Sequence, residues 1–335
     1  MISIPRVIFL AASLCLAMPR ATHAHCQGHD LFLTLKEQAP AAYAAIENAA
    51  SEMPFRRGKL FRLSRQGSDP SYVFATLHLS DPRITGFSSQ LRAALTQSKI
   101  VVLESTETGD VLRQVMADNR PAWRRATAAN EDLRADRLLD KKDFAQLEAL
   151  VASKGFPESA AREYNPAMLA LLLDLPGCAV STSTARPYVD EIVANIARDN
   201  KIETVGLERM IEQVEILNGL PRDTERGLLV AFLRQSERGE DDLETTIARY
   251  IEGDIGGYLA WLRSAEPIPG VAEAQMPKAF LDRLIPLRNH RMRDRALPIL
   301  QRGGVFLAVG AAHLPGRDGL LSLFEQAGYT IESVE

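Results

Sequence analysis

The sequence predicts a single α/β domain whose central sheet is mixed, mostly parallel, and interrupted by long helical insertions. Short apolar runs rich in β-branched residues, typical of buried strands, alternate with longer segments whose apolar residues recur at helical spacing. Several of the strand-like runs lead into a histidine or a glutamate. Open α/β sheets bind ligands at the carboxyl ends of their strands, so we expect the functional site at that edge.

The first 24 residues have the pattern of a secretory signal peptide. An apolar stretch from Val7 to Met18 follows Arg6, and Ala21-Thr22-His23-Ala24 has the small residues that precede a cleavage site. The stretch is too short to cross a membrane, and no later segment is long and apolar enough to replace it. We expect a periplasmic or secreted protein of residues 25–335 without a stable membrane span; an uncleaved anchor is the alternative.

The net charge and the cysteine content limit the possible partners and the possible compartment. The 335 residues carry a formal net charge of −4, whereas binding to nucleic acid requires a basic surplus on one face, so we expect no nucleic-acid partner. Loss of the leader leaves Cys26 and Cys178, which either form one disulfide in an oxidising compartment or stay as two thiols.

The first part of the mature chain has the pattern of a helical segment, a β-hairpin and a βαβ unit. The patterns predict helices over 31–51 and 88–97, and strands over 59–64, 72–77 and 99–103. A right-handed crossover between the last two strands would place His78 and Glu104 at the carboxyl ends of neighbouring parallel strands.

Two long helical insertions, at about 109–198 and 209–300, separate the remaining strands. Between them, 201–207 predicts a shorter strand that ends at Glu208. After the second insertion, Val305 to Val309 forms the most continuous apolar run, and small residues then lead to His313. Small residues leave room for a ligand beside an imidazole. The sequence closes with a helix over 318–327 and a strand over 329–334.

Two strand-end histidines and one strand-end glutamate are the main candidates for chemistry. His78, Glu104 and His313 supply two imidazoles and a carboxylate, a donor set that suits a divalent cation such as Mn, Co or Zn and leaves positions open for water. Such a cation activates water for hydrolysis without a covalent intermediate. The alternative is that these side chains are structural groups with ordinary hydrogen bonds.

Three further polar residues have a functional and a structural interpretation. Arg288 is a candidate for binding a substrate carboxylate or a developing oxyanion, while Asn289 is well suited to cap the helix that follows. The pattern alone favours the capping role. Glu208 is a possible second carboxylate, although a glutamate at the start of a helix also complements the helix dipole.

Two motifs with a histidine in their fourth position stand near the ends of the mature chain. One is Gly310-Ala311-Ala312-His313, which continues into Leu314-Pro315-Gly316, and the other is Ala75-Thr76-Leu77-His78. With Glu104 and the Arg288-Asn289 pair, they resemble the TraB/GumN family, whose two Gly-x-x-His motifs lie at these places. This family comprises bacterial relatives of the Tiki metalloproteases, with more distant similarity to erythromycin esterase and ChaN-type haem-binding proteins.

The sequence departs from the family pattern at two places. Ala75 replaces the glycine of the first motif, and alanine takes a positive φ less easily. The family's Gly-Leu-Asp ahead of the mid-chain helix is missing, with Ser181-Thr182-Ser183-Thr184 in its place. The matches at Leu207-Glu208 and Pro176-Gly177-Cys178 agree with the family.

The resemblance implies a metal-dependent hydrolase, peptidase-like, in which His78, Glu104 and His313 bind the metal and Glu104, Arg288 and Asn289 serve catalysis. A peptide or a small molecule would be the substrate. The two departures motivate an alternative, a non-catalytic envelope-associated binding or assembly protein with a degenerate site. A haem-binding role, as in the ChaN-type relatives, is the third possibility.

Overall fold

The structure, a computed structural model, describes residues 26–173, 187–264 and 276–335. The predicted signal peptide and Cys178 therefore lie outside the described residues. Cys26 is disulfide-bonded, and its pairing with Cys178 stays a prediction.

The core of the fold is one six-stranded mixed sheet in the order β4-β3-β5-β2-β1-β6. The four strands from β4 to β2 are parallel, and β1 and β6 are antiparallel to their neighbours. The prediction of a mostly parallel mixed sheet is therefore confirmed. The strands are β1 (Leu60–Ser64), β2 (Ser71–Thr76), β3 (Ile100–Leu103), β4 (Glu203–Gly206), β5 (Val305–Gly310) and β6 (Thr330–Ser333).

The last central strand, β5, lies between β2 and β3, so the expectation that these two strands are neighbours is wrong. Thr76 of β2 is opposite Gly310 of β5, and Leu103 of β3 is opposite Ala308. This register brings the carboxyl ends of three parallel strands to one edge. His78 follows β2 and Glu104 follows β3, so these two residues reach that edge on opposite sides of β5.

Helices precede the first strand and separate most of the later strands along the chain. The helices before β4 are α1 (Leu31–Gln38), α2 (Pro40–Ser51), α3 (Ser89–Thr96), α4 (Gly109–Asp118), α5 (Arg120–Thr127), α6 (Ala135–Leu138), α7 (Lys141–Ser153), α8 (Ala160–Glu163), α9 (Pro166–Leu173) and α11 (Val189–Asp199). Those after β4 are α12 (Met210–Leu217), α13 (Arg222–Ser236), α14 (Gly239–Ile251), α15 (Ile255–Leu262), α16 (Lys278–Asp282), α17 (Arg288–Leu300) and α18 (Leu320–Gln326).

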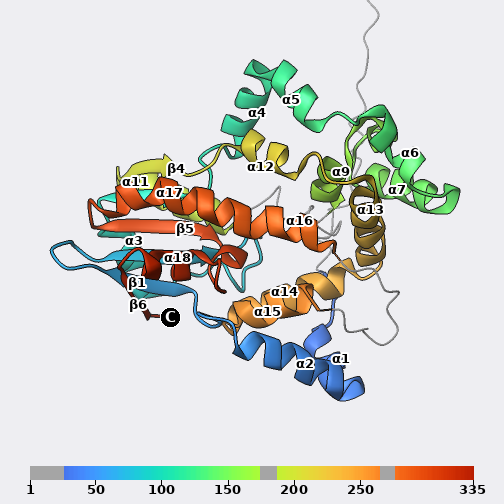
Figure 1. Cartoon of the computed structure of the whole chain (residues 1–335). Coiled ribbons are helices and arrows are strands. Elements are labelled where there is room, and N and C mark those ends of the chain that lie inside the picture. Colours follow the sequence, from blue (N-terminus) through green and yellow to red (C-terminus); the bar gives the residue numbers. More distant parts are fainter. Residues whose placement is uncertain (1–25, 174–186, 265–275) are drawn as a thin grey trace, which may run out of the picture.

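Helices cover both faces of the central strands. Every residue of β3, and every residue of β5 up to Val309, is buried, as expected for parallel strands enclosed on both faces. Helix α11 contacts β3, β4 and β5 and lies against α3, while α17 packs against α18. Figure 1 shows the sheet on one side of the molecule, with α6, α7, α9 and α13 grouped beyond the site edge. That helical group encloses a second apolar cluster, which includes Leu147, Leu169 and Leu228.

A π-helical segment, η2 (Arg283–Leu287), joins α16 to α17. Pro286 lies inside it, and proline cannot donate the helical hydrogen bond and clashes with the preceding turn of a regular helix. The wider π-turn absorbs this proline instead of ending the helix. Asn289 is consequently inside a continuous helix and fully buried, so its predicted role as a helix cap is wrong.

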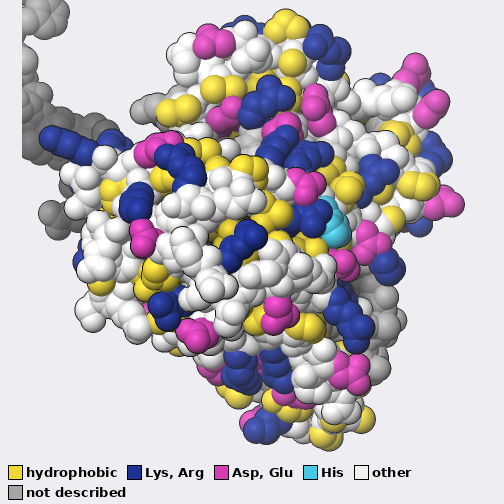
Figure 2. Space-filling view, turned by 60° about the vertical axis from the view of Figure 1, so that its left-hand side comes forward, with side chains coloured by type: hydrophobic (Ala, Val, Ile, Leu, Met, Phe, Trp, Pro, Cys, Tyr) yellow, Lys and Arg dark blue, Asp and Glu magenta, His cyan; other side chains and the backbone are white. Residues whose placement is uncertain are grey.

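The surface carries both signs of charge. Figure 2 shows basic, acidic and apolar side chains interspersed over one face, without a large basic area on that face. Among the helices that the structure describes, none has the length and apolar character needed to cross a membrane.

Candidate active site

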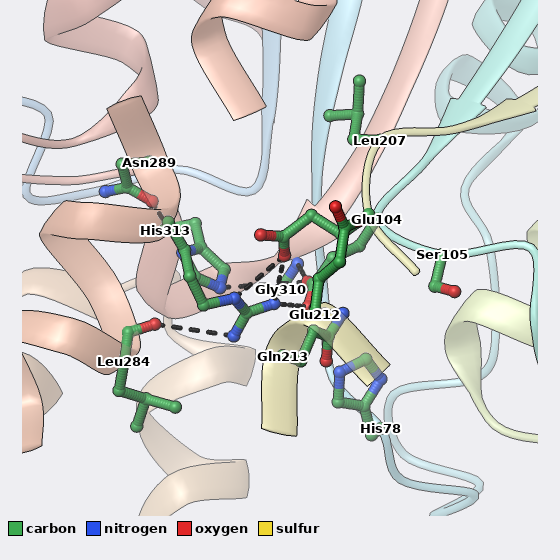
Figure 3. Close-up of polar contacts among 12 residues, drawn as sticks. His78, Glu104, Ser105, Leu207, Glu212, Gln213, Leu284, Asn289, Gly310 and His313 are labelled. Carbon is green, nitrogen blue, oxygen red and sulfur yellow. Dashed lines mark hydrogen bonds and ion pairs between the residues drawn. The ribbon is translucent and has the colours of Figure 1, made fainter. Parts of the chain in front are cut away.

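Glu104 and His313 meet at the carboxyl edge of the sheet. Glu104 directly follows β3, and His313 ends the short 3-10 turn η3 (Ala311–His313) that follows β5. Their side chains are 7% exposed, with His313 Nε2 3.9 Å from Glu104 Oε2. The Gly310 N–H donates to the same carboxylate oxygen at 3.0 Å, which fixes it beside the imidazole. Figure 3 shows these three residues together at the end of β5.

Gly310 is required here for space and not for its backbone conformation. Its φ is −51°, which any residue adopts, but an added Cβ would lie 3.2 Å from Glu104 Oε2 and 3.4 Å from His313 Cδ2. The space beside Gly310 is taken by Glu104 and His313 themselves, and the expected room for a ligand beside His313 stays a prediction.

The hydrogen bonds of Asn289 determine which nitrogen of His313 carries the proton. Asn289 Nδ2 donates to the carbonyl of Asp318 at 2.7 Å, so its Oδ1 must be the atom that faces His313 Nδ1, at 2.6 Å. An amide oxygen only accepts, so Nδ1 is the protonated nitrogen. Burial lowers the pKa of His313 to about 3. The imidazole is therefore neutral, with the lone pair of Nε2 directed at Glu104.

Arg288 forms a buried bridge between two carboxylates. Its guanidinium donates to Glu104 Oε1 and lies 2.8 to 2.9 Å from Glu208 Oε2, and all three residues are at most 6% exposed. Burial opposes the charged form of Glu104, but the adjacent Arg288 outweighs it and holds the pKa of Glu104 below its ordinary value. Burial raises the pKa of Glu208. Arg288 thus keeps Glu104 ionised and in place.

His78, the third predicted metal ligand, is at the same edge but is not in contact with the other two. Its Nδ1 lies 2.9 Å from Asp190 Oδ2, and the other oxygen of that carboxylate accepts from the Thr76 hydroxyl at 2.6 Å. Asp190 raises the pKa of His78. The His78 side chain is 62% exposed, so water screens this ion pair and limits the shift. Figure 3 draws His78 beyond Gln213, away from the group around Glu104.

Asp190 is the site residue that the sequence interpretation missed. It lies in the first turn of α11, directly after Tyr188 and Val189. The Ser181-Thr182-Ser183-Thr184 segment stands where the resemblance leads us to expect Gly-Leu-Asp. That segment, Ser181 to Thr184, lies outside the described residues.

The other departure from the family pattern carries no conformational cost. Ala75 is a fully buried residue inside β2, and the described residues with positive φ other than glycine are Phe55 and Lys201. The carbonyl of Ala75 accepts from the Tyr250 hydroxyl at 2.7 Å. The concern that alanine distorts a turn at this place is therefore not supported, because no turn is there.

The side chains of His78, Glu104 and His313 have the chemistry of ligands for a divalent cation, but the three do not converge on one point. Each Nδ1 is held by an oxygen, the usual outer hydrogen bond of a metal-binding histidine, which leaves Nε2 as the ligand atom. Metal–nitrogen and metal–oxygen bonds of about 2.1 Å each span up to about 4.2 Å, so one ion can reach both His313 Nε2 and Glu104 Oε2 across 3.9 Å. Over the described ranges, however, no three His, Cys, Asp or Glu side chains converge on one point.

A cavity of about 320 Å³ adjoins the site on the side of β4. Glu208 contributes to its wall, whereas His78, Glu104 and His313 do not. The Glu212 carboxylate in this wall is paired with Arg295 at 2.9 Å, and Glu107 accepts from the backbone N–H of Met210. The lining is therefore polar and internally paired.

The fold and the edge site define an α/β protein with a buried Glu–Arg–His group at the carboxyl ends of its parallel strands. The TraB/PrgY/gumN family model matches residues 60–333, so the chain belongs to this family. The match spans the whole sheet and every candidate site residue. Neither the curated proteins nor the solved structures contain a match to the chain.

Proposed function

We propose that this protein is a periplasmic or secreted metal-dependent hydrolase, peptidase-like, in which His78, Glu104 and His313 bind a divalent cation. Mn, Co and Zn all suit two imidazoles and a carboxylate. The compartment follows from the signal-like sequence of residues 1–24, and the substrate is a peptide or a small molecule.

The observation that carries this proposal is a pair of acceptors that face each other without a proton between them. The Glu104 carboxylate is ionised, and the lone pair of His313 Nε2 faces it at 3.9 Å. Two acceptors at this separation repel each other unless a cation or a donor lies between them. A divalent cation satisfies both at once, and water is the alternative occupant.

The charge of the surrounding groups also favours a cation. Glu104, Glu208 and Asp190 are buried carboxylates, and Arg288 is the buried guanidinium that the described residues place against two of them. Buried charge without a counter-charge is costly. Arg288, together with the partly exposed Arg291 at 3.8 Å from Glu208 Oε1, offsets part of this negative charge, and a divalent ion would offset more of it.

The residues of the chain have separate tasks in hydrolysis. A divalent cation, when bound, supplies a Lewis acid that polarises a carbonyl and activates water. Glu104, kept ionised by Arg288, would supply Oε2 as a ligand of this cation, and because its pKa is lowered its catalytic task is to hold the cation and not to keep a proton. Arg288 is occupied by two carboxylates, so it orients Glu104 and is not free to bind a substrate carboxylate. Asn289 keeps His313 in the tautomer that presents Nε2.

Metal content and amide-bond cleavage test this function together. We expect the purified mature protein to bind close to one equivalent of Zn, Mn or Co and to cleave peptide substrates. His78→Ala and His313→Ala should each lower metal affinity at least tenfold and abolish cleavage, since each removes one ligand.

His290→Ala is the matched control, because His290 is 46% exposed and donates to neither Glu104 nor His313 among the contacts of the described residues. It should bind metal and cleave like the wild type. A protein that binds no divalent metal, or whose cleavage survives His313→Ala, would contradict the proposal.

A further inference from the structure

The carboxylate of Asp190 has two partners that together determine its orientation. Its Oδ1 accepts from the hydroxyl of Thr76 at 2.6 Å, and its Oδ2 faces His78 Nδ1 at 2.9 Å. Thr76 is fully buried and Asp190 is 8% exposed. Asp190 also lies in the first turn of α11, where the helix dipole stabilises a negative charge.

This arrangement leaves one end of the His78 imidazole bound and the other available. Because a carboxylate accepts and does not donate, Nδ1 of His78 carries the proton when the ring is neutral. The lone pair is then on Nε2. The side chain is 62% exposed, so Nε2 is accessible although its anchor is buried. The ring edge also contacts Tyr188, with centroids 5.8 Å apart at 87°, which restrains its plane.

We propose that Asp190 is a positioning residue that selects the Nδ1–H tautomer of His78 and thereby presents its Nε2 lone pair as a ligand. The tautomer follows from the contacts of Asp190 with Thr76 and His78, without any bound ion. Its use for binding a cation rests on the proposed function.

An isosteric substitution reverses this selection. In Asp190→Asn, the amide oxygen would accept from the Thr76 hydroxyl, since this buried donor has no other acceptor among the described residues. The amide NH2 would then face His78 Nδ1 and require it to accept. The neutral ring must in that case carry its proton on Nε2, the nitrogen that would otherwise bind the ion. The shape of the side chain is unchanged, but the ligand atom is blocked.

Ring nitrogen chemical shifts report the tautomer directly. We would label histidine with ¹⁵N, assign His78 with the His78→Ala variant, and record the metal-free mature protein at about pH 10, where an imidazole is neutral. The wild type should show Nδ1–H, and Asp190→Asn should show Nε2–H. Thr76→Val in the Asp190→Asn background should mix the tautomers, because it removes the donor that orients the amide.

A second readout is the affinity for Zn²⁺ alone, measured by calorimetry. Asp190→Asn should weaken binding by about 10-fold to 100-fold, the range known for groups that orient metal ligands. Asp242→Asn is the control for placing an amide at a buried carboxylate, because Asp242 pairs with Arg238 and has no histidine contact among the described residues. It should change neither the His78 tautomer nor the affinity.

The two readouts separate this inference from the proposed function. An Nδ1–H signal that persists in Asp190→Asn overturns the role of Asp190, even if the protein binds Zn²⁺. A tautomer that switches as expected supports that role, even if neither protein binds Zn²⁺, in which case the metal-dependent function fails. Circular dichroism would confirm that Asp190→Asn is folded, and if it is not, the Asp190→Ala variant, which removes the acceptor facing Nδ1, must loosen the preference for Nδ1–H or the inference fails.

Discussion

Asn289 Oδ1 lies 2.6 Å from His313 Nδ1, and this contact joins the helix after the π-turn to the turn that follows β5. Both residues are buried, and the Asn289 amide is itself held by the carbonyl of Asp318. One asparagine therefore sets the tautomer of His313 and connects the two elements that flank β5 in the sequence.

Asn289→Leu should destabilise the protein by about 1 to 3 kcal/mol, because the Nδ1–H of His313 would stay buried without an acceptor. Urea unfolding measures this change. His290→Ala, next in the same helix and largely exposed, should stay within about 0.5 kcal/mol of the wild type. Equal effects of the two substitutions would show that the Asn289–His313 contact contributes little.

The sequence predicted most of the fold because its strands are short, apolar and well separated. Val305 to Val309 and Ile100 to Leu103 are fully buried, and such strands give continuous apolar runs that can be recognised locally. The order of strands could not be obtained in the same way. That β5 enters between β2 and β3 depends on packing between segments about 200 residues apart, for which the local pattern holds no signal.

The candidate site residues come from the sequence, whereas the contacts among them come from the structure. The strand ends gave His78, Glu104 and His313 as candidates, but the predicted helix began at Asn289, which was therefore interpreted as a cap, whereas the helix continues back through Pro286. The π-turn that accommodates this proline depends on tertiary packing. Asp190 was missed because an aspartate in a first helical turn is ordinary, and only its approach to His78 distinguishes it.

Arg288→Met should cost about 3 to 5 kcal/mol of stability, since it removes the buried guanidinium shared by the Glu104 and Glu208 carboxylates and leaves only the partly exposed Arg291, 3.8 Å from Glu208. Equilibrium unfolding of the metal-free protein gives this value. Adding Glu208→Gln to the Arg288→Met background should recover part of the loss, because one of the two buried charges disappears. Strictly additive effects would contradict a shared charge network.

Gly310→Ala and Ala75→Gly form a matched pair of opposite substitutions in the two motifs. In Gly310→Ala, the new Cβ would lie 3.2 Å from Glu104 Oε2 and force the carboxylate to shift by a few tenths of an ångström. We expect Zn²⁺ affinity, measured by calorimetry, to fall about tenfold or more because a ligand atom moves. Unchanged affinity would mean that the space at Gly310 is not used for a ligand.

Ala75→Gly should instead leave Zn²⁺ affinity within about twofold and lower stability by roughly 0.5 to 1 kcal/mol, the entropic cost of glycine inside a strand. Ala75 is in the regular part of β2, so restoring the glycine of the motif relieves no strain. An increase in affinity would revive the interpretation of this motif as degenerate. The same calorimetric and unfolding measurements serve both members of the pair.

Glu225, which is not part of the candidate metal site, should make the stability of the protein depend on pH. It lies on α13 with 2% exposure, and its Oε2 has no hydrogen-bond partner in the parts of the chain that the structure describes. Burial raises the pKa of Glu225 to about 7, against the opposing effects of the Leu220 N–H and Arg283. In the unfolded chain an ordinary glutamate has a pKa near 4.3.

The folded state holds the proton of Glu225 more tightly than the unfolded state does. The contribution of Glu225 to stability is therefore greatest below about pH 4.3, and it is lost as the pH rises through about 7. The loss is at most about 4 kcal/mol for a shift of this size. Glu225→Gln removes it, so we expect urea unfolding of the variant to change less than the wild type between about pH 5 and pH 8. The exposed Glu158→Gln is the control and should follow the wild type. If Glu225→Gln keeps the wild-type slope, the ionisation of Glu225 is compensated by groups that reorganise around it.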